Sequence, residues 1–120
     1  MGRVATAYVG WGVKLPEDMH WGELEEALGG EDNFLTYTWW EDEVNEHLVI
    51  VDGGWDGEEQ YALCWRPATQ KGDEYDKVTA LGVPETPSKE EWAEHAGPLL
   101  ETLGVTDIPD PQWILVVNNI

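Results

Sequence analysis

Residues 46–66 read EHLVIVDGGWDGEEQYALCWR, and this stretch decides the predicted fold. Its two outer parts, Glu46–Val51 and Gln60–Arg66, contain many of the β-branched, aromatic and aliphatic residues that are common in strands. Between them, Asp52–Gly57 holds three glycines and two aspartates, a composition typical of a loop. The pattern therefore predicts two antiparallel strands joined by a glycine-rich hairpin loop.

Three further elements are predicted before this hairpin. Val4–Lys14 alternates and predicts a half-buried strand, in which Gly10 and Gly12 indicate a bend or the close approach of another backbone. Pro16–Leu28 carries apolar residues at helical spacing and predicts a helix. Phe34–Trp40 is rich in β-forming residues and predicts a strand that a short acidic turn joins to the hairpin.

The chain after the hairpin predicts a second helix and a last strand. Asp76–Leu81 is a candidate for a further edge strand. Ser88 and Glu91 form a capping box, so a helix should begin there, and Pro98 should kink or split it because proline cannot donate a backbone hydrogen bond. Trp113–Val117 is a continuous apolar run, which predicts a central strand covered on both faces.

Together these elements predict a single α+β domain spanning residues 1–120. Its sheet should be mostly antiparallel, with two helices packed on one face and the order β-α-β-β-β-(β)-α-β. Eight tryptophans and four tyrosines supply enough apolar area for a core without disulfides. Cys64 is the only cysteine, which excludes an internal disulfide and fits a reducing compartment.

The sequence also predicts where the protein is found. Its first residues lack the pattern of a signal peptide, and its longest apolar run is far shorter than the roughly 20 residues that span a bilayer. We therefore expect a cytoplasmic protein that is monomeric or weakly self-associating.

Acidic residues dominate the charge of the chain. Twenty-five acidic residues against six lysines and arginines give a net charge of −19. Fifteen of the acidic residues lie between Leu15 and Trp65, in a block without lysine or arginine. Such a chain cannot neutralise phosphates, so direct binding of nucleic acid or of an anionic membrane is disfavoured. The charge instead favours a basic protein surface as partner. A solubility adaptation, as in halophiles, is the alternative explanation.

Several tryptophans lie beside the acidic residues of this block. Trp39 and Trp40 are adjacent on a predicted strand and therefore point to opposite faces of the sheet. Exposed tryptophan surrounded by charge is typical of interaction surfaces. The predicted partner-binding residues are Trp39, Trp40, Glu41, Asp42, Glu43 and Glu46 at one turn, and Asp52, Trp55, Asp56, Glu58 and Glu59 at the next. Successive turns of a meander lie at opposite ends of the sheet, about 20 Å apart for strands of this length.

No catalytic residue, metal site or cofactor is predicted. Asp52–Glu59 resembles the first half of a calcium-binding EF-hand loop, but Gly54 and Leu63 occupy two positions where ligands belong. The three histidines are far apart and lack metal-binding spacing. Cys64 and His47 would need a third, orienting group to act as a nucleophile pair, and we expect Cys64 to be a buried structural residue.

These observations predict a non-catalytic acidic protein that occludes a basic surface of a protein partner. In size and charge alone, the chain is similar to the small acidic inhibitors that phages use against host DNA-binding enzymes. The specific hypothesis is a phage or mobile-element inhibitor that mimics nucleic acid and blocks a host nucleic-acid enzyme. Two alternatives stay open: a module that uses exposed tryptophan to bind a carbohydrate or peptide, and an enzyme whose site the sequence does not reveal.

Overall fold

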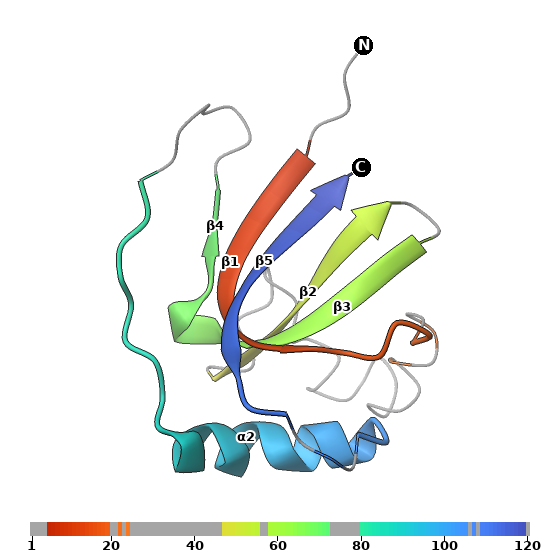
Figure 1. The fold of residues 1–120 in the computed structure, drawn as a ribbon, viewed down its shortest axis with the longest axis vertical. Helices are drawn as coiled ribbons and strands as arrows, with labels where there is room; N and C mark the ends of the chain where they lie inside the picture. The colour runs from red at the N-terminus through yellow and green to blue at the C-terminus, as the bar shows by residue number, and fades with distance from the viewer. Residues whose placement is uncertain are drawn as a thin grey trace.

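A computed structural model describes residues 5–19, 22, 24, 47–55, 58–72, 80–105, 107 and 109–119. The elements in chain order are β1 (Ala5–Lys14), β2 (Leu48–Trp55), β3 (Glu58–Trp65), the short 3-10 helix η2 (Arg66–Ala68), β4 (Gln70–Lys71), α2 (Lys89–Thr102) and β5 (Gln112–Asn119). The strands form a curled sheet, and α2 lies across one end of it (Figure 1). The predicted α+β class and the mostly antiparallel sheet are confirmed.

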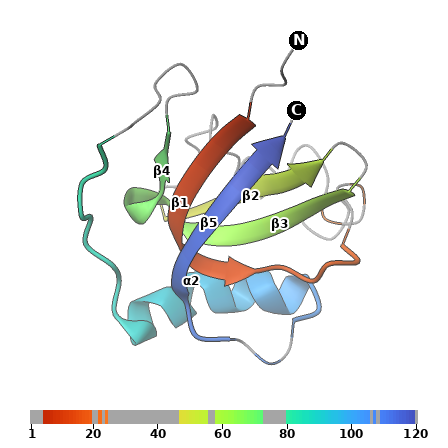
Figure 2. The same cartoon turned by 45° about the horizontal axis from the view of Figure 1, so that its top comes forward.

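The sheet curls until its strands form a ring of pairings. The strand order is β3-β2-β5-β1-β4, with an additional pairing between β3 and β1. Strand β1 pairs with β5 from Ala5 to Gly12, and its last residues, Gly12–Lys14, pair with β3. Figure 2 shows this end of β1 turning to run between β3 and α2. The one parallel contact among the described strands joins β2 to β5 at only two residue pairs, so the ring is incomplete between those strands.

Two glycines allow β1 to cross β3 at close range. A Cβ atom on Gly10 would lie 2.9 Å from Cys64 Sγ, and one on Gly12 would lie 2.6 Å from Cys64 Cα. Real Cβ atoms essentially never approach other atoms this closely. The predicted close backbone approach is therefore confirmed at Gly12, where only glycine fits without a shift of the backbone, whereas Gly10 is in close contact with the side chains of Cys64 and Thr69.

Alternation along the strands separates two apolar clusters. Small side chains fill the inside of the ring: Val49, Val51, Ala62, Cys64 and Val116. Larger side chains on the outer face of β2 and β3 pack against one side of α2, and this outer cluster includes Leu48, Ile50, Tyr61, Leu63, Trp65, Trp92, Ala96, Leu99, Leu100 and Leu103. The buried residues of the inner cluster are small, so the cluster that includes α2 provides the larger core.

Helix α2 begins where the sequence predicted. Ser88 is its N-cap, and the Ser88 hydroxyl accepts a hydrogen bond of 3.1 Å from the backbone N–H of Glu91. Gly104, with φ of 82°, follows the last turn. The helix is not split at Pro98, because it continues through that residue. Pro98 and Glu94 are exposed, so water can bond to the Glu94 carbonyl that lacks its usual donor.

Other predicted elements are corrected or lie outside the described residues. Of the first predicted helix, only Gly22 and Leu24 are helical residues that the structure describes, so two helices on one face are not confirmed. The predicted strand at 34–40 lies outside the described residues. The edge position beside β1 is taken by β4, with Val9 opposite Gln70, whereas Ala80 and Leu81 are not in a strand. None of the described helical segments is long and apolar enough to cross a membrane.

Candidate functional site

Most of the predicted partner-binding residues cannot be placed. Trp39, Trp40, Glu41, Asp42, Glu43, Glu46 and Asp56 lie outside the described residues. The backbone brings the others together at one end of the β2–β3 hairpin, where Trp55 pairs with Glu58 and Gly54 with Glu59. Asp52 lies further along β2 and is half-buried.

The predicted loop at Asp52–Gly57 is too long. Strand β2 continues to Trp55 and β3 begins at Glu58, so Asp52–Trp55 belong to a strand. Gly53 is needed for packing rather than for a turn, because a Cβ atom there would lie 2.8 Å from Cγ1 of Val116 on β5. A glycine in a strand can thus mark a close strand neighbour as well as a loop.

A second acidic region surrounds α2. Residues 85–110 contain seven acidic residues and one lysine. We call the exposed acidic residues of the helix itself the acidic helix surface, and they are Glu90, Glu91, Glu94 and Glu101. Glu85, Asp107 and Asp110, in the segments before and after the helix, are also exposed. This region was not predicted as a binding surface, because the block at residues 15–65 contains more acidic residues and no lysine or arginine.

Little positive charge among the described residues compensates the carboxylates of the acidic helix surface. Within the described parts of the chain, the one ion pair joins Lys89 Nζ to Asp110 Oδ1 at 3.2 Å, and both side chains are 76% exposed. Pairs this exposed contribute little stability. Glu101 lies in the last turn of α2, where the helix dipole disfavours a negative charge, and no basic residue follows it in that turn. This carboxylate is therefore not explained by helix stability.

Strand β5 exposes three large apolar side chains, which we call the apolar strip. Trp113 is 45% exposed, Leu115 65% and Val117 39%. The predicted coverage of this strand on both faces is therefore wrong: Ile114 and Val116 point into the ring, while the strip lies on the outer side. The reason is that α2 packs against the outer cluster on β2, β3 and the end of β1.

The apolar strip continues onto β1 and adjoins the helix region. Trp11 on β1 is opposite Trp113, and their rings meet edge to face with centroids 5.4 Å apart. Trp113 follows Asp110 by three residues, and Asp110 is paired with Lys89 in the first turn of α2. The strip therefore begins beside the acidic region around α2.

Two histidines that are far apart in sequence meet beside Trp65 of the outer cluster. The rings of His47 and His95 stack with centroids 4.0 Å apart, and Trp65 lies 5.4 Å from the first and 5.5 Å from the second. The spacing of His47 and His95 in the sequence does not indicate this contact. Cys64 points into the ring, on the other face of β3 from Trp65, so it does not form a pair with His47. Among the described residues, no three acidic, histidine or cysteine side chains gather around a point suited to a metal ion.

Cys64 is fully buried, as expected. Burial raises the pKa of its thiol from 9.0 to about 12, and the Thr69 hydroxyl partly opposes this shift. The thiolate is the reactive form of cysteine, and here it is strongly disfavoured at neutral pH.

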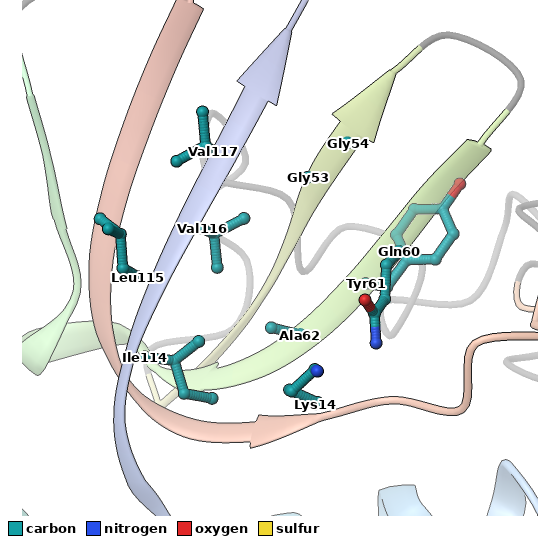
Figure 3. Close-up of a pocket in the computed structure, with 10 residues that line it drawn as sticks. All are labelled: Lys14, Gly53, Gly54, Gln60, Tyr61, Ala62, Ile114, Leu115, Val116 and Val117. Atoms are coloured by element: carbon teal, nitrogen blue, oxygen red, sulfur yellow. The ribbon is translucent and has the colours of Figure 1, made fainter.

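A pocket is lined by residues of four strands of the ring. It has a volume of about 280 Å³, and its lining includes Lys14 from β1, Gly53 from β2, Gln60 and Ala62 from β3, and Ile114 and Val116 from β5. Figure 3 looks into it between β5 and β3, with Lys14 at its lower edge. Residues from four separate strands form the pocket, so no local sequence pattern indicates it.

Comparison with protein-family models, with curated proteins and with solved structures finds no match to the chain. The proposed function therefore depends on the surfaces of the chain itself.

Proposed function

We propose that this protein is a non-catalytic binding protein that docks its acidic surface on a basic surface of a protein partner. The observation that carries the proposal is the acidic helix surface: four exposed carboxylates on one helix that have no ion-pair partner among the described residues. Charges left unpaired on a folded surface attract an oppositely charged partner and speed its association. Glu101 adds support, because its position in the last turn works against the helix dipole.

The spacing of these carboxylates fits a basic groove only loosely. With a rise of about 1.5 Å per residue, Glu90, Glu94 and Glu101 lie along roughly 16 Å of helix axis. A nucleic-acid duplex carries one charge for about every 1.7 Å of its axis, so the helix is much sparser. The partner's basic residues would therefore be covered by a few separate contacts. The specific version of the proposal remains an inhibitor, encoded by a phage or mobile element, that covers the basic site of a host nucleic-acid enzyme.

A charge-reversal experiment tests the proposal. The partner is first isolated by affinity capture and its association is then followed by biolayer interferometry at several salt concentrations. The triple variant Glu90→Lys, Glu94→Lys, Glu101→Lys should slow association at least about tenfold at low salt, because steering depends on local charge. The matched control reverses Glu17, Asp18 and Glu85, which are also exposed. Equal effects of the two variants, or parent-like binding by the helix variant, would contradict the proposal.

A second candidate function rests on the apolar strip. Trp113 is 45% exposed and is supported edge to face by Trp11, which holds an aromatic platform at the surface. Such a platform suits the stacking of a sugar ring or the anchoring of a peptide side chain. In this case the protein is a tryptophan-based binding module, and its charge serves solubility.

Salt dependence separates the two candidates. Binding through the acidic helix surface should weaken steeply between low and moderate salt, whereas binding through the apolar strip should change little. Trp113→Ala should then abolish binding while the triple helix variant leaves it intact. Leu81→Ala is a suitable control because Leu81 is also exposed, at 43%, but is not part of the strip.

A further inference from the structure

The pocket between β5 and β3 combines an apolar wall with a cation. Ala62, Ile114 and Val116 belong to the small apolar cluster inside the ring, or pack against it, and reach the pocket from two strands. Lys14 is one of only six basic residues in the chain. It is exposed, and among the described residues it makes no ion pair. None of the described lining residues is acidic, although the chain has 25 acidic residues.

A second donor lies next to Lys14. In the β1–β3 register, Lys14 is opposite Ala62, and Gln60 is two residues along β3, so its side chain projects from the same face. Such diagonal neighbours are about 7–8 Å apart at Cα, within reach of long side chains. In Figure 3 the amide of Gln60 is directed toward the end of the pocket where Lys14 lies. An ammonium and an amide N–H can each donate to one oxygen of a carboxylate.

We infer that this pocket binds a small monocarboxylate with an apolar body. The carboxylate would lie between Lys14 and Gln60, and the apolar body would contact Ala62, Ile114 and Val116. A dianion such as a phosphate monoester is disfavoured, because a chain of net charge −19 repels it more strongly and offers one lysine here.

The volume limits the size of the ligand. A buried apolar cavity of about 150 Å³ accommodates benzene. A pocket of about 280 Å³ therefore has room for an aromatic ring with a short acidic arm. It lies slightly below the usual range of small-molecule sites, so affinity should be modest, with a dissociation constant on the order of 1 mM.

This site does not depend on the proposed partner interface. The pocket lining includes no residue of the acidic helix surface, although Leu115 and Val117 belong both to the lining and to the apolar strip. A ligand can therefore bind here whether or not the protein binds a basic partner.

Phenylacetate is a suitable probe, with phenylacetamide as its neutral analogue and phenyl phosphate as the dianion. Titration of the isotope-labelled full chain, followed by NMR, should give saturable shifts at Gln60–Ala62 and Ile114–Val117. Phenylacetate should bind more tightly than either of the other two compounds. The variant Lys14→Met keeps most of the side-chain length but removes the charge, and it should weaken phenylacetate binding about fivefold or more while leaving phenylacetamide unaffected.

The matched control is Lys71→Met, which removes the same charge from an exposed residue of β4 that does not line the pocket. It should leave phenylacetate binding within about twofold of the parent. The inference is overturned if phenylacetate causes no saturable shifts, if its shifts fall elsewhere, or if the two lysine variants weaken binding equally.

Discussion

Gly12 and Cys64 are in direct backbone contact at the point where β1 leaves β5 and joins β3. A Cβ atom on Gly12 would lie 2.6 Å from Cα of Cys64 and would also collide with the carbonyl oxygen of Leu63. Both obstacles are backbone atoms, which cannot turn away as a flexible side chain can. The ring of pairings among β1, β3, β2 and β5 therefore depends on the absence of a side chain at residue 12.

The substitution Gly12→Ala should consequently destabilise the protein by about 3 kcal/mol or more, at the upper end of the cost of inserting one methyl group. Urea unfolding followed by tryptophan fluorescence measures the change. Gly82→Ala is the control, because a Cβ atom on Gly82 would meet nothing within 4 Å. That variant should stay within about 0.5 kcal/mol of the parent. A Gly12 variant as stable as the Gly82 variant would mean that β1 and β3 do not pair in this way.

Local signals in the sequence were enough to locate β1, most of β2 and β3, α2 and β5. The cap at Ser88 and the inward face of α2 are examples, since both follow from residues within a few positions of each other. Non-local contacts were not predictable in the same way. The glycine at residue 12 indicated a close approach, but nothing near it in the sequence identifies Cys64 as the residue it meets.

The candidate sites were less predictable than the fold, for two physical reasons. An apolar run such as Trp113–Val117 is compatible with burial on both faces and with exposure on one, and only the position of α2 decides between them. The pocket brings together Lys14 and Ile114, which are far apart in sequence, because β3 and β5 both pair with β1. The acidic helix surface was not predicted, although Glu90 and Glu94 have the four-residue spacing of one helix face and could have indicated it.

Cys64 should make the stability of the protein fall at alkaline pH. Its thiol has a pKa of about 12 in the folded protein, raised by burial from 9.0. The stabilisation linked to this proton is fully present below pH 9, where the thiol is protonated in both states. Above pH 9 the unfolded chain loses the proton first, so the stability should fall by about 1.4 kcal/mol per pH unit until the folded thiol also ionises.

Other groups titrate in the same range, so the comparison is with Cys64→Ala. Urea midpoints between pH 8 and pH 10.5 should fall more steeply for the parent than for this variant. In the parent, a thiol reagent at neutral pH should react slowly in the native state and rapidly after unfolding. Parallel pH profiles together with rapid native labelling would show that Cys64 is accessible.

Added salt should stabilise the protein at neutral pH. Folding brings the carboxylates of a chain of net charge −19 closer together, and salt screens their repulsion. Sodium chloride is the suitable salt, because it screens charge with little effect on apolar solvation. The urea midpoint should rise between low and moderate sodium chloride. A flat or falling midpoint would mean that the acidic groups are already compensated.

Glu101 should be a destabilising residue. It is exposed in the last turn of α2, whereas Glu90 is exposed in the first turn, where the dipole favours a carboxylate. The variants Glu101→Gln and Glu90→Gln remove the same charge from the same helix, so their difference isolates the dipole contribution. At low salt Glu101→Gln should be more stable than Glu90→Gln by about 1 kcal/mol, and the difference should shrink as salt is added. Thermal or urea unfolding of the two variants measures it. If the two variants are equally stable, the Glu101 carboxylate does not destabilise the fold. The position of Glu101 would then no longer support a role in binding.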